Sequence, residues 1–305
     1  MKVLIFGSTG LVGSSLVRNL SNNSKLDKII ASTRKDTNLF SIDETRKIIE
    51  LHNPNIIINA AAKVGGILAN NTYRTNFILS NLKININILE SIIDKPNIKV
   101  INLGSSCIYP LNTINPIKES SLMTGPLEPT NSSYAMAKLT AIELGSALTK
   151  EFGHKVINLM PTNLYGPYDN FSDNESHVIP GLINRMHKAK INNESKFHVW
   201  GTGKPLREFL FVDDLSDAIN FIINNEINIE LLNVGSGFEV TINELAQLIK
   251  VTIGYKGEIT FNTNFPDGNP RKLLDTSKLN NLGWFAKTDL IEGLSLTYKW
   301  FLENK

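Results

Sequence analysis

The sequence predicts an α/β fold in which a doubly wound parallel sheet precedes a smaller mixed α/β region. Short apolar runs rich in β-branched residues alternate with helix-length stretches over the first 160 residues, as in repeated strand–helix–strand units. The runs are apolar at nearly every position, which indicates strands covered by helices on both faces. After Pro161 the pattern changes to loops rich in Pro, Gly and Asn before helical periodicity returns.

The individual elements follow in order from these patterns. Strands are expected in the first part at residues 3–6, 28–31, 56–59, 100–103 and 156–160. Helices are expected in the second part at residues 179–190, 215–224, 242–251 and 290–301. The segment FLFVDDLSDAINFII resembles a strand that runs into a helix begun by Asp, and LLNVGSG resembles another strand that ends in a turn. The chain is therefore expected to return in part to the first sheet around residues 208–238. We therefore predict a first domain over residues 1–160 and a smaller second domain mainly over residues 161–305.

Composition excludes several classes of protein. Lys and Arg total 31 against 29 Asp and Glu, without a long run of either sign, so neither nucleic acid nor an anionic membrane is an expected partner. The apolar run after Lys2 is too short for a signal peptide or a membrane span. A single cysteine fits a reducing compartment, and we expect a cytoplasmic protein. No cluster of His, Cys and carboxylates suggests a metal site.

A glycine-rich loop follows the first strand. Three glycines spaced three residues apart stand where this strand ends and a helix through Leu20 begins. Such glycines allow a tight turn and a close approach of the backbone to a pyrophosphate, which the free N–H groups of the helix N-terminus bind. We therefore expect a Rossmann-type dinucleotide site formed by Gly7, Ser8, Thr9, Gly10, Leu11, Val12 and Gly13.

The segment ASTRKD after the second strand bears on the choice of cofactor. An acidic residue here usually binds a free ribose 2′-hydroxyl, whereas a 2′-phosphate requires a cation. Ser32 and Arg34 stand at these positions, with Lys35 beside them. The sequence therefore favours NADP(H), with Arg34 as the anchor, while Asp36 leaves NAD(H) open.

Tyr134 and Lys138 lie four residues apart on a helical pattern, so both project from one helix face. Their place after the glycine loop and four strand–helix units favours a catalytic pair. The phenol can donate a proton to a carbonyl as hydride arrives, and the ammonium can lower the pKa of the phenol while it binds the nicotinamide ribose.

Cys107 and His177 are weaker candidates on their residue types alone. Cys107, in GSSCIYP, directly follows a predicted strand, and a small buried cysteine is a common packing residue. His177 stands in a loop before a helix, where surface and capping histidines are frequent. From residue type alone, a catalytic role stays open for both residues beside a packing role for Cys107 and a surface or capping role for His177.

Several motifs together resemble a known family. The glycine loop, NAAAKVGG at 59–66, GSSCIYP at 104–110 and YAMAK at 134–138 are similar to those of the extended short-chain dehydrogenases/reductases. The segments LEPTNSSYAMAK, MPTNLYGPYDNF, SHVIPGLINRM and PLREFLFVDDL resemble the GDP-L-fucose synthases within that family, nearly end to end. The resemblance implies epimerisation of GDP-4-keto-6-deoxy-D-mannose at C3 and C5, followed by NADPH-dependent reduction at C4.

The resemblance also assigns catalytic roles. Hydrogens at C3 and C5 are acidic because each is α to the C4 ketone, and Cys107 is implied as the base and His177 as the acid on the opposite face. Ser105 is implied to hydrogen-bond the C4 oxygen beside Tyr134, which would stabilise both the enolate and the developing alkoxide.

Binding residues follow from the same resemblance. Besides Lys138 and His177, cofactor contacts are implied for Pro161, Asn163 and Leu164. Contacts with the GDP sugar are implied for Arg185, Trp200, Arg207 and Lys272, where guanidinium groups suit a diphosphate. Many relatives carry His-Arg where this chain has Ser8 and Thr9, which leaves the 2′-phosphate to Arg34 and Lys35. A homodimer through helices at 79–93 and 134–152 is also implied.

Other functions remain alternatives. A nucleotide-sugar 4-epimerase shares the Tyr134–Lys138 pair but does not need Cys107 and His177. A 4,6-dehydratase would carry Asp-Glu where Ser106 and Cys107 stand. A non-catalytic nucleotide-sensing relative commonly loses Tyr or Lys. A reductase or epimerase for another GDP-linked 4-keto sugar, such as a heptose, is compatible with the same motifs.

Overall fold

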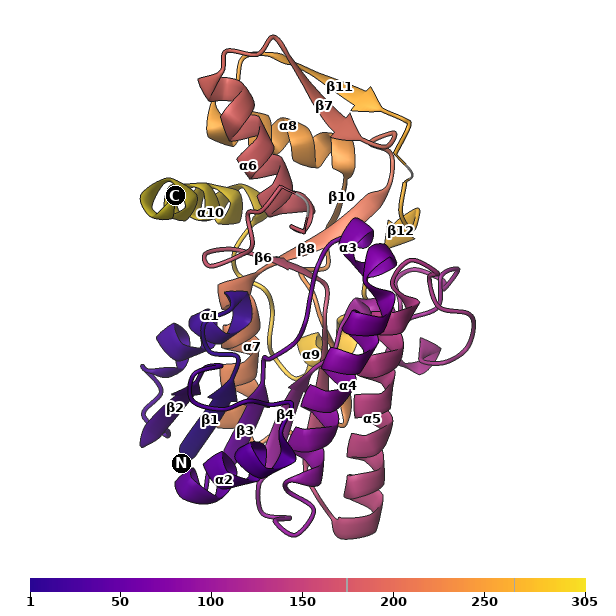
Figure 1. The fold of residues 1–305 in the computed structure, drawn as a ribbon. Coiled ribbons are helices and arrows are strands. Elements are labelled where there is room, and N and C mark those ends of the chain that lie inside the picture. The colour runs from indigo at the N-terminus through magenta and orange to yellow at the C-terminus, as the bar shows by residue number, and fades with distance from the viewer. Residues whose placement is uncertain (174, 266) are drawn as a thin grey trace.

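The structure is a computed structural model that describes residues 1–173, 175–265 and 267–305 (Figure 1). Its larger part is a six-stranded sheet in the order β2-β1-β3-β4-β5-β9, with every neighbouring pair parallel. The strands are β1 (Lys2–Phe6), β2 (Lys28–Ser32), β3 (Ile56–Asn59), β4 (Lys99–Leu103), β5 (Val156–Pro161) and β9 (Leu231–Val234). The strand order reverses beside β1, and ligands of such sheets bind outside the carboxyl ends of the strands at this point.

Helices cover both faces of this sheet. One face carries α1 (Leu11–Leu20) and α7 (Val212–Asn224), and the other carries α2 (Ile42–His52), α4 (Arg74–Glu90) and α5 (Ser132–Phe152) (Figure 1). Val3 and Ile5 pack with α1 and α7, whereas Leu4 and Phe6 pack with the helices of the other face. Successive side chains of a strand point to opposite faces, so β1 is apolar at each of its buried positions, Val3 to Phe6. The predicted doubly wound fold is confirmed.

The smaller part lies beyond the carboxyl ends of these strands, at the top of Figure 1. Its central strand β8 (Leu206–Phe211) pairs antiparallel with β10 (Glu239–Thr241) and parallel with β6 (Asn163–Tyr165) and β12 (Arg271–Lys272). A second parallel pair consists of β7 (Lys196–Trp200) and β11 (Glu258–Asn262). One apolar cluster joins these strands to α6 (Val178–Ile191), α8 (Ile242–Ile253) and α10 (Leu290–Asn304).

The chain returns in part to the first sheet. Within 208–238, α7 packs on α1 and β9 pairs with β5. β8, which contains the predicted strand FLF, belongs to the sheet of the smaller part. The register of β8 depends on partners that are distant in sequence, at 239–241 and 271–272, so no local pattern identifies its sheet.

Short elements complete the chain, and one predicted helix is shifted. They are α3 (Ile67–Thr72), α9 (Ser277–Asn281) and the 3-10 helices η1 (Ser106–Ile108) and η2 (Glu119–Ser121). The helix expected at 79–93 spans Arg74–Glu90 instead. None of the described helices has the length and hydropathy that a membrane span needs.

Candidate active site

Two adjoining cavities lie between the two parts of the molecule. The inner cavity, about 350 Å³, extends from the N-terminus of α1 past η1 to Lys272. The outer cavity, about 400 Å³, lies against α6, β7 and β8. His177, Arg207 and Asn163 line both, so the two cavities adjoin at these residues. The combined site therefore joins the carboxyl ends of the first sheet to the smaller part.

The glycine loop fits a dinucleotide pyrophosphate. Gly7 has φ +77°, and a Cβ there would lie 2.8 Å from the Cα of Ala61. A Cβ on Gly13 would overlap the carbonyl oxygen of Gly7, so glycine is required where α1 packs on its own loop. Gly10 is the N-cap of α1 and provides no side-chain cap. The N–H groups of the first turn are thus available to an anion beside the inner cavity.

The loop residues divide into two groups. Gly10, Leu11 and Val12 line the inner cavity. The hydroxyl of the buried Ser8 donates to the Ser32 carbonyl at 2.9 Å, so it joins the loop to β2. Thr9 is exposed and, like Gly7, Ser8 and Gly13, lines neither cavity.

The segment after β2 has a cation free for a phosphate. The Asp36 carboxylate accepts hydrogen bonds from the backbone N–H and the hydroxyl of Thr33, at 2.8 and 2.6 Å, and these bonds lower its pKa. Asp36 is therefore engaged by its own turn. Arg34 is exposed, lines neither cavity and forms no ion pair within the described ranges.

A proton donor sits at the base of the inner cavity. Burial raises the pKa of Tyr134, the nearby Cys107 raises it further, and a hydrogen bond with Ser105 opposes the shift. The phenol is therefore protonated at neutral pH. Lys138 lies one helical turn further along α5, with its Nζ 5.8 Å from the Tyr134 ring centroid and donating to the Leu103 carbonyl at 2.7 Å.

Lys138 is a buried ammonium with few partners. Burial lowers its pKa to about 8. It does not line the inner cavity itself, but lies behind Tyr134 beside β4. A lysine in this state titrates close to neutral pH and responds strongly to any group that supplies further hydrogen bonds.

Cys107 and Ser105 are placed by the end of β4. Ser105 is the N-cap of η1, and its hydroxyl accepts a hydrogen bond from the Cys107 N–H at 3.2 Å. This turn directs the half-buried thiol into the inner cavity. There the Lys272 Nζ donates to the Cys107 Sγ at 3.4 Å, although the two residues are 165 positions apart in sequence.

His177 faces the same space from the smaller part. It is the N-cap of α6, makes no capping hydrogen bond with its side chain, and lines both cavities. Burial lowers the pKa of its imidazole. When such an imidazole is protonated it is a stronger acid than a solvated one, which suits the donation of a proton.

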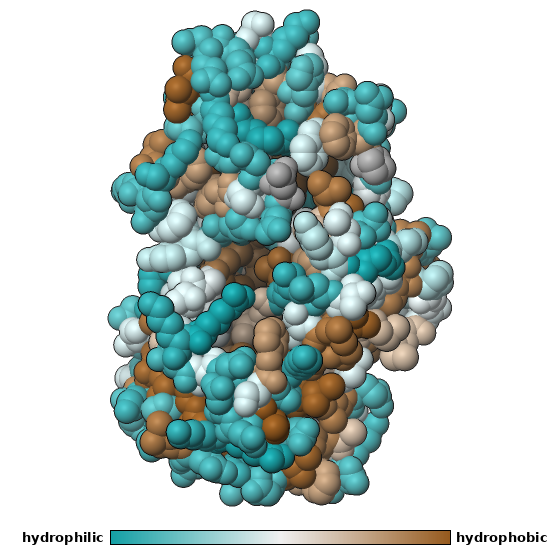
Figure 2. Space-filling view, in the orientation of Figure 1, coloured by the Kyte–Doolittle hydropathy of each residue, from teal (hydrophilic) through white to brown (hydrophobic). Residues whose placement is uncertain are grey.

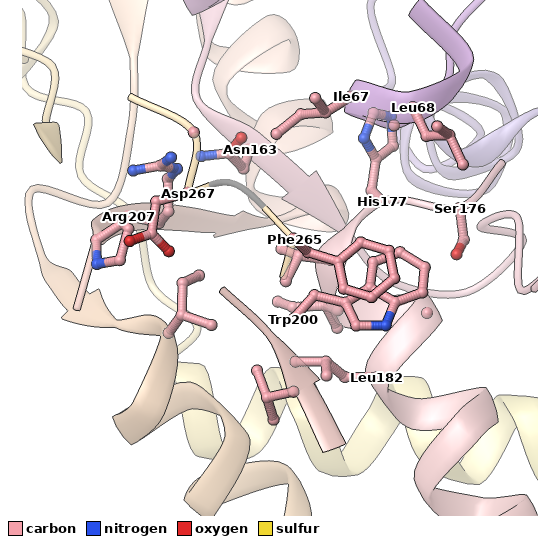
Figure 3. Close-up of a pocket in the computed structure, with 18 of the residues that line it drawn as sticks. Ile67, Leu68, Asn163, Ser176, His177, Leu182, Trp200, Arg207, Phe265 and Asp267 are labelled. Carbon is pink, nitrogen blue, oxygen red and sulfur yellow. The ribbon is translucent and has the colours of Figure 1, made fainter. Parts of the chain in front are cut away.

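Aromatic and cationic side chains form the outer cavity (Figure 3). Trp200 and Phe265 stack with ring centroids 4.7 Å apart and an angle of 15° between their planes. The Arg185 guanidinium lies 4.5 Å from the Trp200 ring centroid. Figure 3 shows Arg207 and Asp267 side by side on one side of the cavity, with His177 and, below it, the stacked rings on the other. Flat faces and two guanidinium groups suit a nucleoside diphosphate.

The structure thus brings most of the predicted residues together. Besides Gly10, Leu11 and Val12, those that line the inner cavity are Ser105, Cys107, Tyr134, Pro161, Asn163, Leu164, His177, Arg207 and Lys272. Arg185 and Trp200 line the outer cavity only. No group of three or more His, Cys, Asp or Glu in the described part of the chain is arranged to hold a metal ion.

Sequence reasoning missed Phe265, Asp267 and Asp169. The first two stand in NFPDGNP, a loop whose Phe and Asp could have been noted as side chains available to a ligand. Asp169 lines the inner cavity, and its Oδ2 is buried without a hydrogen-bond partner in the described structure. Burial raises the pKa of this carboxyl to about 7. No sequence pattern indicates that environment.

The chain is similar to known proteins over nearly its whole length. Residues 3–235 match the model of the NAD dependent epimerase/dehydratase family. Putative GDP-L-fucose synthase 2 of Arabidopsis thaliana is 48% identical, over 99% of this chain and 92% of that protein. GDP-L-fucose synthase of Escherichia coli K12 is 42% identical, over 100% of this chain and 97% of that protein. The structure of a GDP-L-fucose synthetase from Naegleria fowleri bound to NADP superposes with a TM-score of 0.90 at 31% identity. The match covers 99% of this chain and 93% of that chain.

Proposed function

The chain belongs to the NAD dependent epimerase/dehydratase family, and from this premise we propose that it is an NADPH-dependent GDP-L-fucose synthase. It converts GDP-4-keto-6-deoxy-D-mannose to GDP-L-fucose by epimerisation at C3 and C5 and reduction at C4. The observation that carries the proposal is the meeting of Cys107 and His177 in one cavity with Ser105 and Tyr134. A 4-epimerase or a simple reductase requires only the last two.

In the epimerisation, the thiolate of Cys107 takes the proton from C3 or C5. The hydroxyls of Ser105 and Tyr134 donate hydrogen bonds to the C4 oxygen, where the negative charge of the enolate accumulates. The imidazolium of His177 returns a proton to the same carbon from the opposite face. Cys107 is then a thiol and His177 neutral, and exchange with solvent restores both.

In the reduction, NADPH supplies a hydride to C4 when it is bound. Tyr134 donates its phenolic proton to the C4 oxygen as the alkoxide forms, and its burial keeps that proton in place until then. Lys138 stabilises the resulting phenolate with its ammonium. The same two hydroxyls, of Ser105 and Tyr134, thus stabilise charge on one oxygen in both halves of the reaction.

Binding divides between the two parts of the chain. Residues 1–160, with the returning segment within 208–238, hold the dinucleotide, and Arg34 binds its 2′-phosphate. Arg185, Trp200 and Arg207, from residues 161–305, hold the GDP group in the outer cavity.

The test of the proposed function is incubation of the protein with GDP-4-keto-6-deoxy-D-mannose in D₂O with NADPH or NADH. Deuterium at C3 and C5 together with NADPH oxidation supports the proposal, whereas reduction without deuterium, or turnover of only another GDP-linked 4-keto sugar, contradicts it.

The active form is proposed to be a homodimer through α4 and α5. Figure 2 shows apolar side chains gathered on the side of the molecule that these helices form. Leu79, Ile86 and Met136 are all exposed there, and an apolar surface of this kind favours association. Leu79→Asp is therefore expected to halve the mass measured by light scattering, whereas Leu302→Asp, an exposed leucine on α10, should leave it unchanged. A monomeric mass for both variants would contradict the proposal.

A further inference from the structure

Lys272 is placed against the proposed base by a short, firmly held strand. β12 is only two residues long, and Lys272 lies opposite Arg207 on β8. Its neighbours on either side are anchored: the Pro270 carbonyl accepts from the Leu206 N–H at 2.9 Å, and the Leu273 N–H donates to Asn115 Oδ1 at 2.7 Å. The backbone at Lys272 is thus fixed between both parts of the molecule.

A buried carboxylate adds to this anchoring. Glu208 has no exposed surface, and its Oε2 accepts the Leu274 N–H at 3.0 Å while its Oε1 accepts the Gly237 N–H at 2.8 Å. Glu208 therefore holds the chain two residues after Lys272. The side chain of Lys272 is directed at the Cys107 Sγ by a backbone held through hydrogen bonds with β8 and with Asn115.

The two cations of β12 have different partners. Arg271 forms an ion pair with Glu239, at 2.6 Å. Lys272 has no carboxylate within ion-pair distance among the described residues, and its Nζ donates to the Cys107 Sγ at 3.4 Å. An ammonium beside a thiol stabilises the thiolate by charge and by a charge-assisted hydrogen bond.

Other charged groups around Cys107 leave Lys272 as its main cationic partner. Tyr134 on α5 and Arg207 on β8 both face the thiol. Glu128 and Asp267 face Arg207 in turn and offset its charge. The remaining titratable groups that line the inner cavity are Tyr109, Asp169 and His177.

We propose that Lys272 is a positioning residue for epimerisation, which holds Cys107 as a thiolate aimed into the inner cavity, and not primarily a ligand of the GDP group. The inference rests on the proposed role of Cys107 as the base. It assigns to Lys272 an effect on proton abstraction that a diphosphate ligand would not have. The epimerising base is then assembled only when residues from both parts of the chain meet.

The first experiment measures alkylation of the thiol without any sugar. Cys107 is the only cysteine in the chain, so iodoacetamide reports on one group. In Lys272→Met the pH midpoint of alkylation should rise by about one unit, with alkylation about tenfold slower at pH 7. Lys272→Arg should restore most of the wild-type profile. Arg271→Met, which removes the neighbouring cation on the same strand, should follow the wild type; equal midpoints for Lys272→Met and wild type would overturn the proposal.

The second experiment separates positioning from substrate binding. With GDP-4-keto-6-deoxy-D-mannose in D₂O, Lys272→Met should lower the rate of deuterium incorporation about tenfold at pH 7 and approach the wild-type rate above about pH 9, with KM changed by less than about twofold. A large rise in KM with an unchanged maximal rate would make Lys272 a ligand of the GDP group and overturn the inference. If wild type incorporates no deuterium, the proposed function fails, while the alkylation profile still decides the contact between Lys272 and Cys107.

Discussion

The inner and outer cavities meet at His177 and Arg207 but are built in different ways. The inner cavity lies at the ends of parallel strands, where burial raises the pKa of Tyr134 and lowers that of Lys138. The outer cavity is walled by Trp200 and Phe265, each 40% exposed and stacked on the other. The difference indicates that the inner cavity controls protonation and therefore chemistry, whereas the outer cavity contributes contact area and therefore binding. Variants in the two cavities should accordingly change different kinetic constants.

Tyr134→Phe should have the largest effect. It removes the proton donor while the ring stays in place, so reduction should slow by about 10³-fold or more. Deuterium exchange at C3 and C5 should continue, because Ser105 still donates a hydrogen bond to the C4 oxygen. NADPH oxidation followed by absorbance and exchange followed by mass spectrometry measure the two steps. A wild-type rate of NADPH oxidation would remove Tyr134 from the reduction.

Cys107→Ser should divide the reaction in the opposite way. A serine hydroxyl ionises far less readily than a thiol, so exchange at C3 and C5 should fall by about 10²- to 10³-fold. NADPH binding, measured by fluorescence titration, should not change, since the glycine loop and Arg34 are untouched. Exchange at the wild-type rate would return Cys107 to a packing role.

Asp169→Asn tests how strongly burial controls ionisation in the inner cavity. The pKa of this carboxyl is raised to about 7 by burial, against about 3.9 in an unfolded chain. Between these values the native state binds more protons than the unfolded state, so the free energy of unfolding falls as pH rises from about 4 to about 7. The Asn variant has no ionisable group here, so its free energy of unfolding should not fall in this way. At pH 8 it should be more stable than wild type by about 2 to 4 kcal/mol.

Urea unfolding without cofactor at pH 4 and pH 8 measures this effect. The difference in the free energy of unfolding between Asp169→Asn and wild type should be small at pH 4 and reach its full size near pH 8. Asp43→Asn, at an exposed position in the first turn of α2, is the matched control and should show no gain across this range. A constant difference between Asp169→Asn and wild type at both pH values would show that the carboxyl does not change its ionisation on folding.

The two regions also differ in how well sequence predicts them. The strands of the first sheet were predicted within one or two residues because helices on both faces favour an apolar side chain at nearly every position. The predicted family and fold class are likewise confirmed. Around the outer cavity, no local pattern identifies the sheet to which β8 belongs, because its partners at 239–241 and 271–272 are remote in sequence.

The site residues divide along the same line. Sequence spacing predicts the relative placement of residues that share one turn or one helix, such as Gly7 with Gly13 and Tyr134 with Lys138. Contacts that join the two parts, such as Lys272 with Cys107, depend on tertiary pairing and leave no local pattern. Asp169 was missed for a related reason: its sequence position does not reveal that its Oδ2 is buried.

Trp200→Ala should have the smallest effect and tests the outer half of the comparison. It removes one of two stacked rings and the surface under the Arg185 guanidinium, so KM for the GDP sugar should rise about tenfold. The maximal rate should change by less than about twofold, because Trp200 does not line the inner cavity. Phe238→Ala, at an 81% exposed position outside both cavities, should match wild type. Steady-state kinetics at saturating NADPH distinguishes the outcomes: a fall in the maximal rate with KM unchanged would mean that the outer wall also shapes the reacting centre, and the division between chemistry and binding would fail.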